Sequence, residues 1–328
     1  VGYQSLFLNS TGANNTAMGL CSLRANTTGA SNTAVGTSAL VANTTACENV
    51  AVGKDSLKAN TTGDFNTAVG FQALLKNTTA DNNTAFGNDT LVCNQTGTAN
   101  TGVGSFALYC NTGSCNTAVG TDALFTNTSG TNNTSIGRSS LFANTTGANN
   151  TAVGSLALDT NTTGNYNVAV GFDALTSNSN GAENTAVGNE SLCKNTTASC
   201  NTAVGLQSLF NNTTGETNTA VGRKSLHANT TAGCNTAIGY HSLCSNTTGA
   251  CNTAVGRDAL LQTSTGVNNT AIGKTSGSIM ATGNNNTFLG YDAQPTNNSV
   301  SNEITLGNSS VTNLRCADTS ISSLSDLR

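Results

Sequence analysis

Small and aliphatic residues recur along this chain with a period of 17 residues, in the unit Asn-Thr-Ala-Val-Gly at residues 32–36. The closing glycine returns from Gly2 to Gly307, and its one phase error is a spacing of 16 residues between Gly104 and Gly120. In most units a leucine follows the glycine by four residues. A period of this length predicts a stack of near-identical units in which each unit contacts only its neighbours.

The apolar positions of one unit form two short pieces, Thr-Ala-Val and Ser-Leu-x-x, and lack the three- and four-residue spacing of a helix. Gly and the segment Asn-Thr-Thr-Gly separate the two pieces, and these residue types favour turns. The pattern predicts two strands and two turns per unit, with the leucines and the aliphatic residues before glycine as the core. The predicted fold is all-β, a parallel β-solenoid of 17-residue rungs.

Stacked rungs place each strand about 4.8 Å from its copy, so roughly 18 rungs predict a rod on the order of 85 Å long. Asparagines recur at two fixed positions of the unit and can form amide ladders along the rod. We therefore assign structural roles to the repeated positions represented by Asn32, Gly36, Leu40, Asn43, Asn49 and Gly53.

The repeat divides the chain into three parts. Residues 1–273 form the regular shaft, and residues 274–307 form degenerate terminal rungs in which Gly277 replaces leucine and Glu303 replaces asparagine. Residues 308–328 have no repeat partner and predict a cap or exit segment. The chain begins in mid-unit at Val1 without an initiator Met, which indicates a piece of a longer polypeptide.

Composition excludes several classes of function. The chain has 328 residues, of which 9% are charged, and its net charge is −4. The 12 Lys and Arg residues are scattered, whereas nucleic-acid binding needs a clustered basic face. No apolar run approaches the ~20 residues of a membrane span. We expect neither nucleic acid as a partner nor membrane insertion of this segment.

The phrase Asn-Thr-Ala-Val-Gly-x-x-Ser/Ala resembles the head repeat of the YadA-like trimeric autotransporter adhesins, although the turn here is about three residues longer. The resemblance covers Val1 to about Gly307. It implies a left-handed β-roll assembled as a homotrimer. Because a rung of 17 residues is small for a monomeric solenoid, the face of small Ala and Ser residues opposite the Val and Leu side is expected to pack against other copies.

The last seven residues, 322–328, resemble the start of an intramolecular chaperone domain of the endosialidase type, which follows such shafts in phage tail fibres and related fibres. The resemblance implies trimerisation driven by a chaperone domain that is missing after residue 328. It also implies self-cleavage near Ser325 and Asp326.

No residues predict catalysis, a cofactor or a metal site. His227 and His241 lie on neighbouring rungs at different positions of the unit, without a Cys or carboxylate cluster around them. Asp173 and Glu190 are adjacent in one column, but that column accepts Gln as readily, and a glycosidase pair also needs a substrate cleft. We therefore expect that the chain is not an enzyme.

Eleven cysteines favour an oxidising destination. Cys93 and Cys110 lie one period apart, as do Cys234 and Cys251, so each pair falls within reach of a disulfide. The alternative is that they are buried small residues or free thiols. Because the count is odd, one cysteine is unpaired or forms an interchain bond.

Sequons for N-glycosylation occur in nearly every Asn-Thr-Thr turn. They are a by-product of the ladder unless the host glycosylates secreted proteins. The candidate glycosylation sites are Asn26, Asn43, Asn60, Asn144 and Asn229.

Three functions compete. The first is a structural shaft of an extracellular, cell-surface or virion fibre that supports attachment to a host. The second is an adhesin whose shaft surface itself binds host glycans or a protein receptor. The third is ice binding, which is disfavoured because the sequence lacks Thr-x-Thr on one flat strand and its threonines fall mostly in turns.

Overall fold

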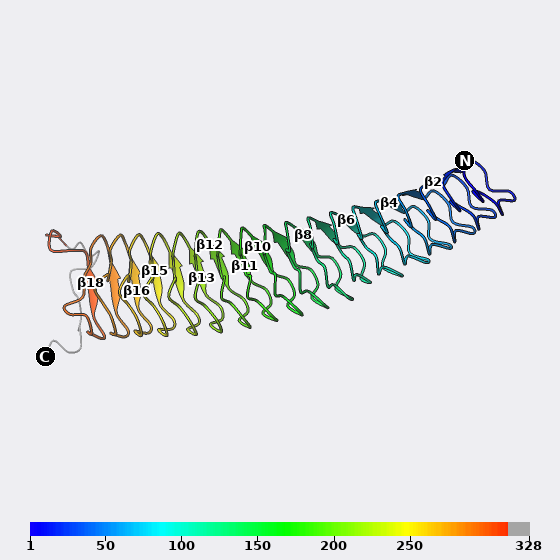
Figure 1. Cartoon of the computed structure of the whole chain (residues 1–328). Helices are drawn as coiled ribbons and strands as arrows, with labels where there is room; N and C mark the ends of the chain where they lie inside the picture. Colours follow the sequence, from blue (N-terminus) through cyan, green and yellow to red (C-terminus); the bar gives the residue numbers. More distant parts are fainter. Residues whose placement is uncertain (314–328) are drawn as a thin grey trace.

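The protein is a long, narrow rod in which one short strand of every rung stacks on the next (Figure 1). This computed structural model describes residues 1–313, and within them it contains strands and turns but no helix. Strand β1 (Thr16–Met18) lies near one end of the rod and β18 (Ile304–Leu306) near the other. The prediction of an all-β parallel solenoid is confirmed.

The strands have three residues each and form a single parallel sheet of 18 strands. Each strand pairs in register with the next, so that Ala34 lies opposite Ala51 and Val35 opposite Val52. The remaining strands are β2 (Thr33–Val35), β3 (Val50–Val52), β4 (Thr67–Val69), β5 (Thr84–Phe86), β6 (Thr101–Val103), β7 (Thr117–Val119), β8 (Thr134–Ile136), β9 (Thr151–Val153), β10 (Val168–Val170), β11 (Thr185–Val187), β12 (Thr202–Val204), β13 (Thr219–Val221), β14 (Thr236–Ile238), β15 (Thr253–Val255), β16 (Thr270–Ile272) and β17 (Thr287–Leu289).

The core consists of the leucine column and the alanine column, and the prediction that the aliphatic residue before glycine is buried was wrong. Ala34 and Leu40 are completely buried, whereas Met18 is 54% and Ile136 41% exposed. The reason is the alternation of side chains along a strand, which points the middle residue inward and its two neighbours outward. The middle residue is usually alanine, so the larger aliphatic side chains line the outside of the sheet.

The second predicted strand of each rung does not form. In the rung that follows Gly53, Asp55 and Leu57 have φ angles of 59° and 46°, in the left-handed region. The backbone still bonds to both neighbouring rungs: Asp55 N–H donates to Thr37 O (2.9 Å), and Leu57 N–H donates to Ala73 O (2.9 Å). A left-handed leucine costs about 1–3 kcal/mol by itself, so we infer that these bonds and the burial of the side chain hold it.

The repeated glycine is required by both conformation and space. Gly36 has a φ of 134°, and a Cβ at this residue would lie 2.5 Å from the carbonyl oxygen of Gly53 in the next rung. The backbones of successive glycines therefore approach more closely than any other residue allows.

The first asparagine column forms a ladder of amide hydrogen bonds inside the rod. Nδ2 of Asn43 donates to Oδ1 of Asn26 (2.8 Å) and to the backbone oxygen of Ala46 (3.0 Å), and Oδ1 of Asn43 accepts from Nδ2 of Asn60 (3.1 Å). Asn43 is completely buried. Each such side chain closes its own turn and also joins it to the turns on both sides.

The second asparagine column links turn to strand. Nδ2 of Asn49 donates to Gly63 O (2.9 Å), while Oδ1 accepts from the backbone N–H of Asn66 (2.9 Å). Asn49 N–H in turn donates to Oδ1 of Asn32 (3.0 Å). Because these amides are buried and paired, they replace the water that a turn normally needs.

The first ladder breaks where the sequence departs from the repeat. Oδ1 of Asn94 lacks a partner because the turn in the next rung is one residue short. In that shorter turn Nδ2 of Asn111 donates to Gly113 O (2.8 Å) but not to Asn94 Oδ1. Oδ1 of Asn246 lacks a partner because Thr263 occupies the next position of the column. Both unsatisfied atoms thus follow from single breaks in the repeat.

The degenerate rungs continue the solenoid with a different core. Gly277 takes the place of a leucine, and Phe288 takes the place of the alanine in β17. Phe288 is completely buried, and a Cβ at residue 277 would lie 2.7 Å from its Cδ2. The phenylalanine therefore fills the space that the missing leucine leaves.

Replacing an asparagine within the ladder should destabilise the rod more than replacing one at its break. Asn161→Ala and Asn246→Ala each leave an upstream amide oxygen without its donor, but only Asn161→Ala also removes the acceptor of Asn178 Nδ2 (2.9 Å). We expect the unfolding free energy of Asn161→Ala to be lower by about 1–3 kcal/mol. Denaturant unfolding of both variants measures this difference, and equal losses would contradict the ladder.

Candidate functional surface

One cavity lies at the C-terminal end of the described part of the shaft. Its volume is about 440 Å³, and its walls include Asp292, Gln294 and residues 305–309. Asp292 is its one titratable lining residue, so the cavity holds no pair of groups for acid and base catalysis. The columns of side chains on the outer surface offer further candidate sites.

Acidic side chains gather on neighbouring rungs where the sequence places Asp173 next to Glu190. Burial first and the charge of Glu190 second raise the pKa of Asp173. Burial and then Asp173 likewise raise the pKa of Asp159. Gln207 Nε2 donates to Glu190 Oε2 (2.6 Å). Within residues 1–313 no group of three or more His, Cys, Asp or Glu side chains has the arrangement of a metal site.

A column of cations and aromatic rings follows the glycine in the later rungs, although the basic residues look scattered along the sequence. The guanidinium carbons of Arg223 and Arg257 each lie 5.7 Å from the ring centroid of Tyr240. Nζ of Lys274 lies 5.4 Å from the ring centroid of Tyr291. The signal was present in the sequence as one position of the repeat, the residue directly after glycine.

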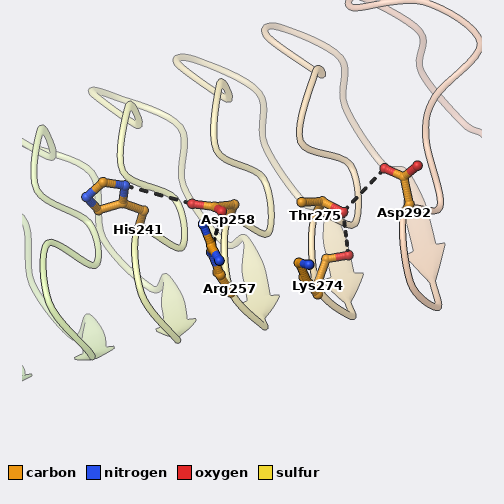
Figure 2. Close-up of polar contacts among 6 residues, drawn as sticks. All are labelled: His241, Arg257, Asp258, Lys274, Thr275 and Asp292. Carbon is orange, nitrogen blue, oxygen red and sulfur yellow. Dashed lines mark hydrogen bonds and ion pairs between the residues drawn. The ribbon is translucent and has the colours of Figure 1, made fainter.

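Figure 2 shows the polar contacts of the adjacent column, which include an ion pair with Arg257. Arg257 Nε donates to Asp258 Oδ2 (3.0 Å), and His241 Nδ1 lies 3.8 Å from Asp258 Oδ1. Burial lowers the pKa of His241 more than Asp258 raises it, so the imidazole is neutral at pH 7 and Arg257 is the ionic partner of Asp258. In the next rungs Thr275 Oγ1 donates to the backbone oxygen of Lys274 (2.7 Å) and lies 3.3 Å from Asp292 Oδ1.

The two histidines are packing residues. His241 stacks on Tyr240 with centroids 3.8 Å apart, and His227 stacks on Phe210 with centroids 5.4 Å apart. Burial lowers the pKa of His227 as well. Each imidazole is half-buried against an aromatic ring.

All ten cysteines among residues 1–313 are free thiols in the structure. Cys93 N–H donates to Tyr109 O (3.0 Å), which places Cys93 beside the rung of Cys110, and burial and then Cys93 raise the pKa of Cys110. Cys234 and Cys251 are exposed on neighbouring rungs. The two disulfides therefore stay predictions for the protein in an oxidising environment.

The candidate glycosylation sites lie inside the rod, which overturns their interpretation as sugar acceptors of the folded protein. Nδ2 of Asn144, for example, donates to Asn127 Oδ1 (2.8 Å) and Gly147 O (2.9 Å), so both of its hydrogens are engaged. The sequons are a by-product of the ladder. The completely buried asparagines are Asn26, Asn43, Asn60, Asn144 and Asn229.

Ser325 and Asp326, the candidate cleavage junction, lie outside the described residues, as does Cys316. Within residues 1–313 there is no helix long and apolar enough to span a membrane. No protein-family model matches the sequence, and no curated protein is similar to it. The likeness to adhesin heads and to fibre chaperone domains thus rests on the residues that suggested it.

Neutralising Asp173 should stabilise the rod at neutral pH. Because its folded-state pKa is raised, the native state binds a proton at higher pH than the unfolded chain, and stability falls as pH rises through that window. We expect Asp173→Asn to raise the melting temperature at pH 7 and to leave it unchanged near pH 3, where the carboxyl is protonated.

The matched control is Asp122→Asn, whose neighbours in the same column are Phe106 and Ser139. Thermal unfolding followed by circular dichroism measures both variants. An equal gain for Asp122→Asn, or a gain for Asp173→Asn that persists at pH 3, would show that the buried, ionised carboxylate of Asp173 beside Glu190 is not the cause.

Proposed function

We propose that this chain is the structural shaft of an extracellular, cell-surface or virion fibre and that it performs no catalysis. The observation that carries the proposal is the single in-register sheet that runs from β1 to β18 without interruption. Such a shaft holds an attachment domain at a fixed distance from its base. Its surface repeats the same backbone at every rung, which favours a spacer over a localised active site.

Three sets of bonds support a spacer role because all of them run from rung to rung. The strands pair along the rod, the left-handed segments bond to both neighbours, and the two asparagine columns add side-chain bonds. Length is then proportional to the number of rungs. The length of the rod can therefore change in evolution by the gain or loss of whole units, without a change in the core.

The proposal predicts that the rod shortens by a fixed amount for each unit removed. Deletion of residues 138–188 removes three 17-residue units in phase and joins Gly137 to Asn189, as each glycine normally joins the next unit. We expect a rod shorter by about 14 Å, from three strand spacings of about 4.8 Å, measured by small-angle X-ray scattering. Collapse or unfolding of the deletion variant would contradict a modular shaft.

We further propose a homotrimer, but with a packing face different from the one the sequence suggested. The small Ala and Ser residues are internal, and the aliphatic residue before glycine lies outside in every strand. These residues form a continuous apolar stripe along the sheet, including Ile136 (41% exposed), Ile238 (40%) and Ile272 (46%). Monomeric proteins rarely expose so extended an apolar surface, which supports burial of the stripe between copies.

Sedimentation of the shaft should give three times the chain mass of 32.9 kDa. Ile136→Lys combined with Ile238→Lys should shift it to smaller species, because charges are costly in an apolar interface. Thr121→Lys with Ser155→Lys adds the same charges outside the stripe and should leave the mass unchanged. A shaft that sediments as a monomer would refute the trimer.

Ice binding gains one supporting observation. One threonine of each typical unit, such as Thr33 or Thr67, begins a strand and faces outward beside the aliphatic column, so not all threonines lie in turns. The result is a regular Thr-x-Val array on the sheet. Thermal hysteresis of a monomeric shaft would favour ice binding. Absence of thermal hysteresis would argue against ice binding and would not affect the proposed spacer role.

A further inference from the structure

We propose that the later rungs carry a binding site for a linear acidic polysaccharide, one that bears carboxylate or sulfate groups along its length. The site is a cationic stripe, formed by the residues directly after glycine in five consecutive rungs. All of its members are exposed. They are Arg223, Tyr240, Arg257, Lys274 and Tyr291.

The stripe is a local positive feature on an acidic rod. Its column contains no Asp or Glu in any rung from Tyr3 to Tyr291, although the whole chain has a net charge of −4. Carboxylates are confined here to the adjacent column, where Asp258 pairs with Arg257. A separate column of cations attracts anions locally even where the net charge of the protein is negative.

Tyr240 holds two guanidinium groups in place. Arg223 lies one rung before it and Arg257 one rung after it, both within 5.7 Å of the ring centroid. The ring itself is fixed by stacking on His241. Ordering an arginine in advance reduces the entropy that is lost when the arginine binds a ligand.

The donors of Arg257 are divided between protein and solvent. Its Nε bonds to Asp258, yet its side chain remains 62% exposed, which leaves the terminal N–H groups available (Figure 2). Two parallel N–H groups of a guanidinium match the two oxygens of a carboxylate or sulfate. Lys274, over the ring of Tyr291, adds a third cation further along the rod.

The spacing of the cations favours a linear polyanion over a small anion. Arg223 and Arg257 lie two rungs apart, about 9.6 Å from in-register strand spacing, and Lys274 lies about 4.8 Å further on. One small anion cannot contact all three, whereas a chain laid along the rod can. Nucleic acid is the less suitable ligand, because it requires many neutralised phosphates and the stripe offers only three cations.

This inference does not depend on the spacer role, since a rod of any function could carry the stripe. The inference names a class of ligand for the alternative function, in which the surface of the shaft itself binds glycans. Failure of the deletion experiment would leave it intact, and failure of the binding experiment below would leave the spacer role intact.

The test uses the whole chain and immobilised heparin, a sulfated and carboxylated polysaccharide, at low ionic strength. The variant Arg223→Gln/Arg257→Gln/Lys274→Gln should lose affinity at least about tenfold, the equivalent of one charge-assisted hydrogen bond. The matched control Lys54→Gln/Lys76→Gln/Arg138→Gln also removes three positive charges, but from earlier rungs, and should change affinity less than about twofold.

Two further variants test the positioning role of Tyr240. Tyr240→Ala should weaken heparin binding, and Tyr240→Phe should not, because it keeps the ring between the guanidinium groups. Neutral dextran should not bind. The proposal is overturned if the chain does not bind heparin, if both triple variants lose affinity equally, or if duplex DNA binds more tightly than heparin through the same three cations.

Discussion

Each rung of this rod can satisfy its backbone only through the rungs on either side of it. An isolated rung would leave the N–H and C=O groups of its strand and of its left-handed segment without partners. In the stack, Leu57 N–H finds Ala73 O and Asp55 N–H finds Thr37 O. This constraint explains the close glycine approach, the buried amides and the leucines in an unfavourable backbone conformation, since each is tolerated only when its neighbours are in register.

Because the rungs stack in register, equivalent residues of successive rungs form columns along the rod. A side chain at an outward position meets its copy one strand spacing away, so its effect on the neighbours is repeated along the rod. Asp173 beside Glu190 is the unfavourable case, in which burial first and the like charge of Glu190 second raise the pKa of Asp173. Arg223, Tyr240 and Arg257 are the favourable case, in which an aromatic ring separates two cations and orients both. Surface chemistry on such a fold is therefore linear, and it suits linear partners.

Much of the architecture was predictable because it follows from the period. The position of Gly36 and the columns of Asn32 and Asn43 were correctly interpreted, since a residue that recurs in phase must stack on itself. The second strand was not predictable, because left-handed leucines contradict the conformational preference of the isolated residue and are stabilised only by neighbouring rungs.

Other predictions were wrong about the direction in which side chains point. Val35 was expected in the core, but only Ala34 points inward, because a strand of three residues buries one side chain when its middle residue faces the core. Asn144 was a candidate glycosylation site in an Asn-Thr-Thr turn, yet its amide is buried at the centre of that turn. The cationic stripe was not predicted, because its members are 17 residues apart in the sequence and become neighbours only when the rungs stack.

The central claim is that one strand of every rung stacks in register along a single axis. X-ray diffraction from oriented fibres of the shaft tests it most directly. In-register parallel strands predict a strong meridional reflection near 4.8 Å, with the strands lying across the fibre axis. A pattern without that reflection, or one in which it lies on the equator, would contradict the account.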